Sequence, residues 1–399
     1  MSDATLLLSL LFGFYAAWNI GANDVSNAMG TSVGSKALTI KQAVIVAAIF
    51  EFCGAVFFGS HVSETLQQGI INPHTFADTP NILIDGMLAA LLASGLWLQL
   101  ATYFGLPVST THAIVGAIVG FGAIVGGVGA VYWDEVLFIA ASWVVSPLMG
   151  AACGFVFFSL LRKRIFYRSH PLKAAQRLLP WIGALLFTIF ALVGLWNRVS
   201  IFAILGAALL LGLSLTLFLR SKKIAASNLH TEFQQVERLF AWLQIVTACL
   251  MAFSHGANDV ANAIGPLAAI ISIAQTGSTT FSPHIPTWIL VLGGIGIVAG
   301  LATWGWRVIE TIGKKITELT PSRGFSAEFA AAFTVLLASR FGFPISTTHT
   351  LVGAVLGVGL AGGIATLNLR MIRDIALAWI ITIPAGALLS ILCYYMIRS

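Results

Sequence analysis

Long apolar runs alternate with short polar stretches along the whole chain. The twelve apolar segments cover residues 4–35, 41–60, 82–103, 107–129, 134–161, 179–197, 199–219, 239–275, 286–306, 325–341, 345–366 and 373–396. An α-helix needs about 20 consecutive apolar residues to cross a bilayer. The pattern therefore predicts an all-α polytopic membrane protein with about twelve transmembrane helices.

Two sequence elements interrupt this apolar pattern, and each occurs twice. Gly21–Ala28 reads GANDVSNA and Gly256–Ala263 reads GANDVANA, and 8 of 10 positions agree when the next two residues are included. Phe104–Gly122 reads FGLPVSTTHAIVGAIVGFG and Phe341–Gly359 reads FGFPISTTHTLVGAVLGVG, with 12 of 19 positions identical. The second element begins 83 residues after Gly21 in one copy and 85 residues after Gly256 in the other. The chain is therefore predicted to contain two repeats.

Composition supports a membrane protein, because only 9% of the 399 residues are charged, against about 25% in soluble domains. The net charge of +6 does not indicate nucleic-acid binding, since 18 of the 21 Lys and Arg residues lie in or beside short loops expected on one side. This distribution predicts a multi-pass inner or plasma membrane protein with both termini outside. The first segment lacks a basic start and is expected to be a retained span. Four scattered cysteines fit neither a disulfide framework nor a metal pattern.

The loop charges also predict that the two repeats have opposite orientations in the membrane. The first GAND copy falls in a span running inward, and the second falls in a span running outward. We expect a first inverted repeat over 1–161, two intervening spans with basic cytoplasmic loops over 162–238, and a second inverted repeat over 239–399. Inverted repeats with interrupted helices are typical of secondary transporters, whose site lies at the repeat interface near mid-membrane.

The Pro-x-Ser-Thr-Thr-His sequences at Pro107–His112 and Pro344–His349 predict helix starts. Proline disfavours a continuing helix, and Ser or Thr caps the next one. Free N–H groups and hydroxyls at a helix start form a good anion site. We expect 82–129 and 325–366 to be hairpins or broken helices whose tips meet at mid-depth. The glycines expected to pack helices closely are numbers 116, 120, 122, 353, 357 and 359.

The GAND elements place acids and amides where a lipid-facing helix would carry apolar residues. Asp24 and Asp259 would each cost about 2.5–3.5 kcal/mol at mid-membrane, and no Lys or Arg lies within a helical turn of either. A bound cation is the natural partner, and carboxylate, amide and carbonyl oxygens suit a hard ion such as Na⁺. The alternative is a helix-packing motif of small residues held by amides. The amides that accompany the acids are Asn23, Asn27, Asn258 and Asn262.

Five further polar residues lie in apolar segments or beside the paired elements. Glu51 and Glu328 have no acidic counterpart in the other repeat, and each is a candidate cation ligand, proton carrier or structural partner. Arg340 is expected either to pair with an acid or to meet the substrate. His112 and His349 are candidates for anion contact, for titration or for simple packing.

With these residues in place, the chain resembles the PiT family of inorganic phosphate transporters. The paired GANDVxNA and GxPxSTTHxxVGA elements carry the resemblance, which covers roughly 15–130 and 250–365. It implies Na⁺- or H⁺-coupled phosphate uptake, often by a homodimer, and family positions important for transport at Glu51 and Glu328. Residues 220–238 form a short loop where some members carry a long hydrophilic insertion. By this resemblance phosphate would be held by Ser109, Thr110, Thr111, Ser346, Thr347 and Thr348. Cations would be held by Asn23, Asp24, Asn258 and Asp259, with Asn27 and Asn262 beside them.

The expected function is Na⁺-coupled symport of inorganic phosphate, with the lipid bilayer as environment and no cofactor besides the coupling ion. Proton coupling, metal-complexed phosphate and a related sulfate permease remain alternatives within the same architecture. A channel is also conceivable, but broken helices and buried charges favour a carrier. An intramembrane enzyme using Ser109 or Ser346 with a histidine is disfavoured, because the sequence lacks a G-x-S-x-G nucleophile elbow. No catalytic residue is therefore assigned.

Overall fold

In the computed structural model, residues 3–194, 199–221, 228–279, 281, 284–309, 319–363 and 369–399 are described. These residues are almost entirely helical, apart from an isolated bridge that pairs Ile71 with Val131. Eight helical stretches among them are long and apolar enough to cross a membrane. The prediction of an all-α polytopic membrane protein is confirmed.

The helices follow the predicted segments closely. The first part of the chain contains α1 (Asp3–Gly34), α2 (Ile40–Phe58), α3 (Ser60–Gln68), η1 (Pro73–Phe76), α4 (Pro80–Tyr103), α5 (Thr110–Val125), η2 (Val128–Ala130), α6 (Trp133–Leu161) and η3 (Arg162–Phe166). The later part contains α7 (Pro171–Gly194), α8 (Ile201–Ser221), α9 (Leu229–Asp259), α10 (Ala261–Thr276), α11 (Thr287–Thr303), α13 (Pro321–Arg340), α14 (Thr347–Gly362) and α15 (Leu369–Arg398). Each of the twelve predicted segments therefore corresponds to helix.

The two GAND elements differ in local structure. Helix α1 runs unbroken through the first element, whereas the second ends α9 at Asp259, and α10 follows after Val260. Pro266 lies inside α10, and its counterpart in α1 is Thr31. The connection over 61–81, between two of the predicted segments, contains the short helices α3 and η1.

The first glycine of each GAND element lies at a close helix crossing. A Cβ atom on Gly21 would lie 1.9 Å from the carbonyl oxygen of Ile297 in α11, and one on Gly256 would lie 2.0 Å from that of Glu51 in α2. Side chains larger than hydrogen cannot fit at either position. The same crossing is thus made twice, by α1 with α11 and by α9 with α2.

Each hairpin consists of a long helix, an extended return segment and a shorter helix. The chain turns at Gly105 after α4 and at Gly342 after α13, both with positive φ (65° and 73°). The short helix then packs against the long helix of the other half, α5 against α15 and α14 against α6. Glycines permit this contact, since a Cβ on Gly116 would lie 2.5 Å from Ile383 O and one on Gly353 would lie 2.2 Å from Pro147 O. The two halves are therefore interlocked.

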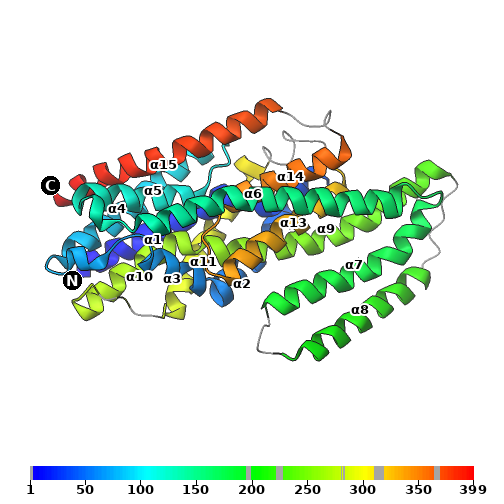
Figure 1. Ribbon diagram of the computed structural model, residues 1–399, viewed down its shortest axis with the longest axis horizontal. Helices are drawn as coiled ribbons and strands as arrows, with labels where there is room; N and C mark the ends of the chain where they lie inside the picture. The colour runs from blue at the N-terminus through cyan, green and yellow to red at the C-terminus, as the bar shows by residue number, and fades with distance from the viewer. Residues whose placement is uncertain are drawn as a thin grey trace.

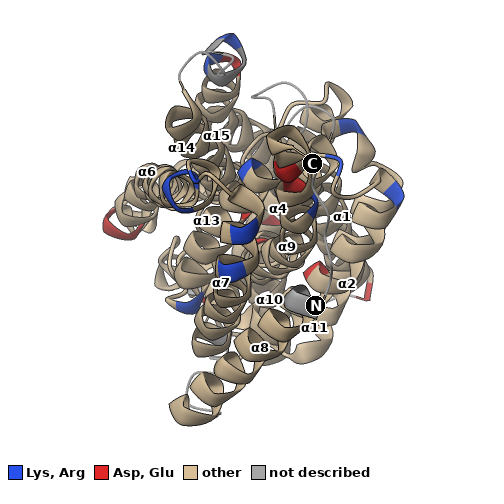
Figure 2. Ribbon diagram, turned by 90° about the vertical axis from the view of Figure 1, so that its right-hand side faces the viewer, with Lys and Arg blue, Asp and Glu red and all other residues tan. Residues whose placement is uncertain are grey.

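The helices form one elongated bundle, with the α7–α8 pair on its flank (Figure 1). Helix α1 begins and α15 ends at the same end of the bundle, as an even number of crossings requires. Seen from the opposite end, Lys and Arg colour several helix ends (Figure 2). The topology places the starts of α5 and α14 inside the bundle, where the candidate site is found.

Candidate functional site

The two Ser-Thr-Thr-His sequences begin helices as predicted. Ser109 is the N-cap of α5, and its side chain accepts a hydrogen bond from the His112 backbone N–H (3.2 Å). Ser346 caps α14 in the same way and accepts from the His349 N–H (3.2 Å). Both serines have extended backbones, which ends the return segment and starts the helix.

The two helix starts meet inside the bundle. The Thr111 hydroxyl donates to the carbonyl oxygen of Ile345 in the opposite return segment (3.0 Å), and the Thr348 hydroxyl donates to that of Val108 (3.1 Å). These four residues are buried. The prediction that the two hairpins meet is confirmed, although the return segments make the contact and the helix-to-helix turns do not.

The first asparagine of each GAND element holds the return segment of its own half. Asn23 Nδ2 donates to the carbonyl oxygen of Leu106 (3.1 Å), and Asn258 Nδ2 donates to that of Phe343 (3.1 Å). Each amide thus satisfies an extended backbone group that lacks a helical partner. These contacts position the threonines that follow.

The second asparagine of each element reaches the hairpin of the other half. Asn27 Nδ2 donates to the Thr348 hydroxyl (2.8 Å), and Asn262 Nδ2 donates to the Thr110 hydroxyl (3.0 Å). All four side chains are at most 2% exposed. One helix turn separates the two asparagines of an element, so each element touches both hairpins.

The two aspartates each accept a threonine hydroxyl. Thr110 Oγ1 donates to Asp24 Oδ2 (2.8 Å), and Thr347 Oγ1 donates to Asp259 Oδ2 (2.7 Å). The predicted anion-binding and cation-binding residues therefore form one buried cluster. We define the central cluster as Asp24, Asn27, Asp259, Asn262 and the threonines Thr110, Thr111, Thr347 and Thr348.

His255 joins the two aspartates and was not among the predicted site residues. Its Nε2 lies 2.9 Å from Asp259 Oδ2 and 3.8 Å from Asp24 Oδ2, and its Nδ1 lies 3.3 Å from Glu51 Oε1. A histidine can supply the same counter-charge to the aspartates as Lys or Arg. The sequence does contain a signal for His255, because a titratable residue inside an apolar run indicates a functional site. His255 directly precedes the second GAND element, and its counterpart before the first element is Ile20.

Several buried oxygens in this region accept no hydrogen bond from the described residues. They include Asp259 Oδ1 and the side-chain amide oxygens of Asn27, Asn258 and Asn262. Asp24, His255 and Asp259 could also hold a metal ion by geometry, since one ligand atom from each lies within 4.8 Å of the others. An oxygen-rich environment of this kind suits a hard cation.

Glu328 lies in a second polar cluster, which contains none of the residues of the central cluster. It accepts hydrogen bonds from Thr31 (2.5 Å), Ser32 (2.6 Å), Thr247 (2.8 Å) and Gln244 (3.3 Å). Glu51 differs, because neither of its carboxylate oxygens accepts a hydrogen bond from the described residues. The two acids therefore have different surroundings, with only Glu51 reaching the aspartates through His255.

The two motif histidines lie in a cluster of aromatic rings. The ring centroids of His112 and His349 are 4.5 Å apart, and they lie 3.9 Å from Trp143 and 3.6 Å from Trp379, respectively. This arrangement agrees with the packing alternative. Arg340 lies at the end of α13 and forms no ion pair with the described residues.

Interlocked halves whose helix starts meet inside an all-helical membrane bundle are typical of membrane transporters. Residues 20–390 match the model of the phosphate transporter family, and the chain belongs to this family. It is 47% identical to the chloroplastic inorganic phosphate transporter 2-1 of Arabidopsis thaliana, over 97% of this chain and 72% of that protein. A solved structure, described as the sodium-dependent phosphate transporter, matches with a TM-score of 0.91 at 40% identity and covers 99% of each chain.

Proposed function

We propose that the protein is a Na⁺-coupled symporter of inorganic phosphate. The observation that carries the proposal is the contact of each buried aspartate with a threonine hydroxyl at a helix start. Hydroxyl donors suit a phosphate oxyanion, and the carboxylates suit the cation that must accompany it. The solved relative that matches over the whole chain is itself described as sodium-dependent.

Electrostatic interactions couple the binding of phosphate to the binding of the cation. Thr110 and Thr347 donate to Asp24 and Asp259, so phosphate would take these hydroxyls in place of the carboxylates. Two like unit charges about 4 Å apart repel by about 4 kcal/mol at an effective dielectric constant of 20. Cations on the aspartates remove this repulsion, so each solute strengthens the binding of the other.

The proposed cation ligands are Asn23, Asp24, Asn258 and Asp259, with Asn27 and Asn262 beside them. The proposed phosphate ligands are Ser109, Thr110, Thr111, Ser346, Thr347 and Thr348. In this role Ser109 and Ser346 act mainly by presenting the first N–H groups of α5 and α14, because their hydroxyls already accept helix N–H groups.

Proton coupling is the second candidate, and a specific contact favours it. His255 and Glu51 are buried beside the aspartates and can exchange protons with them. A protonated His255 would neutralise charge in the same place as a bound cation.

Uptake of labelled phosphate into proteoliposomes, with Na⁺, K⁺ and pH gradients varied independently, separates these candidates. We expect uptake to follow Na⁺ at fixed pH and to resist competition by sulfate. Uptake that follows pH at fixed Na⁺ would replace sodium with protons. Uptake that ignores both gradients would contradict the cation role of Asp24 and Asp259.

We also propose a division into repeats, an oligomeric state and a membrane orientation. Residues 1–161 and 239–399 would form inverted repeats around the intervening 162–238, in a homodimer of the inner or plasma membrane with both termini outside. The sharing of helix starts between the halves supports this division. Cysteine accessibility at the exposed residues 128 and 169 would test the orientation, since these positions should react from opposite sides.

A further inference from the structure

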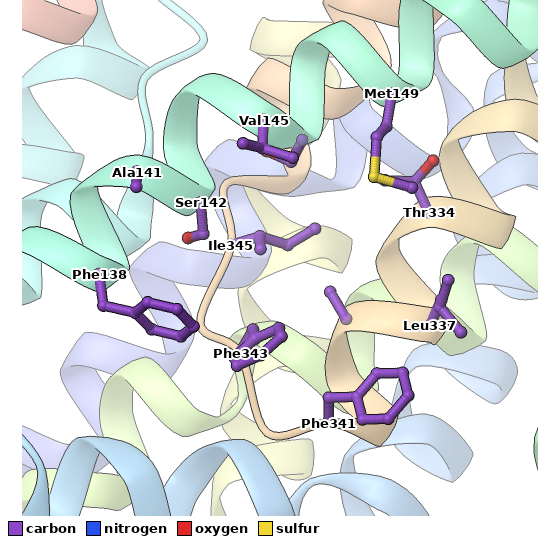
Figure 3. A pocket seen from close by; sticks show the side chains of 12 residues that line it. Phe138, Ala141, Ser142, Val145, Met149, Thr334, Leu337, Phe341, Phe343 and Ile345 are labelled. Carbon is purple, nitrogen blue, oxygen red and sulfur yellow. The ribbon is translucent and has the colours of Figure 1, made fainter. Parts of the chain in front are cut away.

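An apolar cavity of about 380 Å³ lies between α6 and α13, beside the return segment that leads to Ser346. Its walls include Phe138, Val145 and Met149 of α6 and Leu337 of α13, and Figure 3 shows these side chains around the hollow. Phe138 and Val145 are 55% and 51% exposed. The cavity therefore opens on the surface of a membrane-spanning bundle.

The cavity offers few hydrogen bonds to an occupant. The hydroxyls of Ser142 and Thr334, which line it, donate to the carbonyl oxygens of Ile139 (2.6 Å) and Ala330 (2.8 Å) in their own helices. Ser146 contributes a hydroxyl without a partner among the described residues. An occupant is thus held mainly by apolar contact, which suits a hydrocarbon chain.

The apolar cavity continues into a charged pocket at the end of α13. A hollow of about 160 Å³ shares Phe138 and Phe341 with the cavity, and a pocket of about 480 Å³ follows beyond Phe341. This outer pocket is lined by one permanent cation and two acids: Arg340, Glu64 and Glu135. Neither acid forms an ion pair with Arg340 within 4.0 Å in the described chain.

The outer pocket lies at the level expected for lipid headgroups. Glu135 is in the first turn of α6, and Trp133 and Tyr132 at the same helix start are 42% and 38% exposed. Exposed Trp and Tyr at a helix end are typical of the membrane–water interface. An apolar slot thus extends into the bilayer from a pocket at its surface.

We propose that this continuous slot binds one zwitterionic phospholipid, with its phosphate at Arg340, its ammonium group at Glu64 and Glu135, and an acyl chain in the apolar cavity. Charge complementarity selects this occupant, because a lipid with an anionic headgroup would face two carboxylates and gain one guanidinium. The bound chain contacts Phe343 and Ile345 of the return segment. The lipid therefore stabilises the position of the hairpin that carries Thr347 and Thr348.

Native mass spectrometry of the full-length protein tests the proposal, after incubation with equal amounts of phosphatidylethanolamine and phosphatidylglycerol. We expect one retained phosphatidylethanolamine per chain, preferred by about fivefold, the ratio that corresponds to about 1 kcal/mol for one surface charge. Ala141→Phe fills the slot and should abolish retention, whereas Ala152→Phe, an equally exposed change on the same helix, should not. Arg340→Gln should lower the retention of both lipids, because both carry a phosphate. Glu64→Gln combined with Glu135→Gln should remove the headgroup preference, and Asp134→Asn, a neighbouring acid outside the pocket, should preserve it.

Equal retention of the two lipids, or unchanged retention by Ala141→Phe, would overturn the lipid assignment. Conversion of a dimer to a monomer by Ala141→Phe without loss of lipid would identify the occupant as a second copy of the chain. Thermal melting of each variant in the same detergent confirms folding. If Ala141→Phe fails to fold, the smaller Ala338→Leu change fills the same cavity from α13.

Discussion

The two halves of the molecule repeat most of the polar contacts of the paired motifs and differ in their single-copy acids and histidine. Asn23 and Asn258 hold return-segment carbonyls at the same 3.1 Å, and Thr110 and Thr347 reach Asp24 and Asp259 at 2.8 and 2.7 Å. The glycine crossings and the serine caps are duplicated as well. The core of the site is therefore close to twofold symmetric.

The single-copy residues are Glu51, His255 and Glu328. Ile297 makes the glycine crossing equivalent to that of Glu51, and the repeat offsets pair His255 with Ile20 and Glu328 with Leu91. All three are fully buried. A near-symmetric ligand such as phosphate can accept hydrogen bonds from paired donors in both halves. A proton or one additional cation needs only one binding site. We therefore expect the proposed phosphate and cation ligands to act in pairs, and Glu51, His255 and Glu328 to act singly.

The largest expected effect comes from the duplicated glycines. Gly21→Ala and Gly256→Ala each place a methyl group within 2.0 Å of a backbone oxygen, so we expect a loss of more than about 3 kcal/mol of folding free energy. The yield of folded protein by size-exclusion chromatography should fall equally for both. Gly206→Ala, which meets no atom within 4 Å, is the matched control, and unequal losses would show that one crossing dominates folding.

The aspartates test whether the two halves bind cations alike. Asp24→Asn and Asp259→Asn should each raise the half-saturating Na⁺ concentration for uptake by at least about tenfold, the lower range for changes around metal sites. A larger effect at Asp259 would fit its closer contact with His255. Unchanged Na⁺ dependence in both variants would contradict the ligand assignment.

The threonines test whether the anion site is symmetric. Thr110→Val and Thr347→Val each remove a donor to a charged group, worth about 1.5–3 kcal/mol, so the phosphate KM should rise by roughly tenfold or more. Thr188→Val removes a hydroxyl that only bonds its own helix and should leave KM unchanged. An effect confined to one of the two site threonines would show that phosphate binds to one half.

A substitution of Glu328 tests the role of a residue that occurs in only one half. Glu328→Gln leaves some of its four donors without an acceptor, and an unsatisfied buried group costs about 1–3 kcal/mol. The thermal midpoint in detergent should fall, while Asp134→Asn, an exposed acid at the start of α6, should not change it. A midpoint equal to that of the parent protein would mean that these donors find other partners.

The smallest effect is expected at the histidines. His112→Phe and His349→Phe keep the aromatic contacts, so uptake should stay within about threefold, whereas the alanine variants lose aromatic contacts of about 0.5–1.5 kcal/mol each. Phosphate uptake by each variant, measured at several pH values, tests this prediction. A pH profile altered equally by both phenylalanine variants would show that the histidines titrate during transport.

The repeats, the helical segments and most of the central cluster could be predicted because each was encoded locally. Apolar length predicts a span, and the Pro-x-Ser-Thr-Thr sequence predicts a capped helix start. The unbroken course of α1 could not be predicted from its motif, since nearly the same motif ends α9 at Asp259. His255 was missed because its importance depends on α1 and α2, which bring Asp24 and Glu51 to it.

By itself, the sequence determined that the chain is a helical membrane protein, that it is duplicated, and which side chains carry its polar chemistry. These properties follow from composition, periodicity and repeated motifs, which need no knowledge of distant contacts. Only the tertiary structure decided that Thr110 lies beside Asp24 and Asn262, that Glu328 lies in a separate cluster, and that Arg340 lines a charged pocket. The reason is physical: close glycine crossings and extended return segments bring together residues that are 80 to more than 300 positions apart.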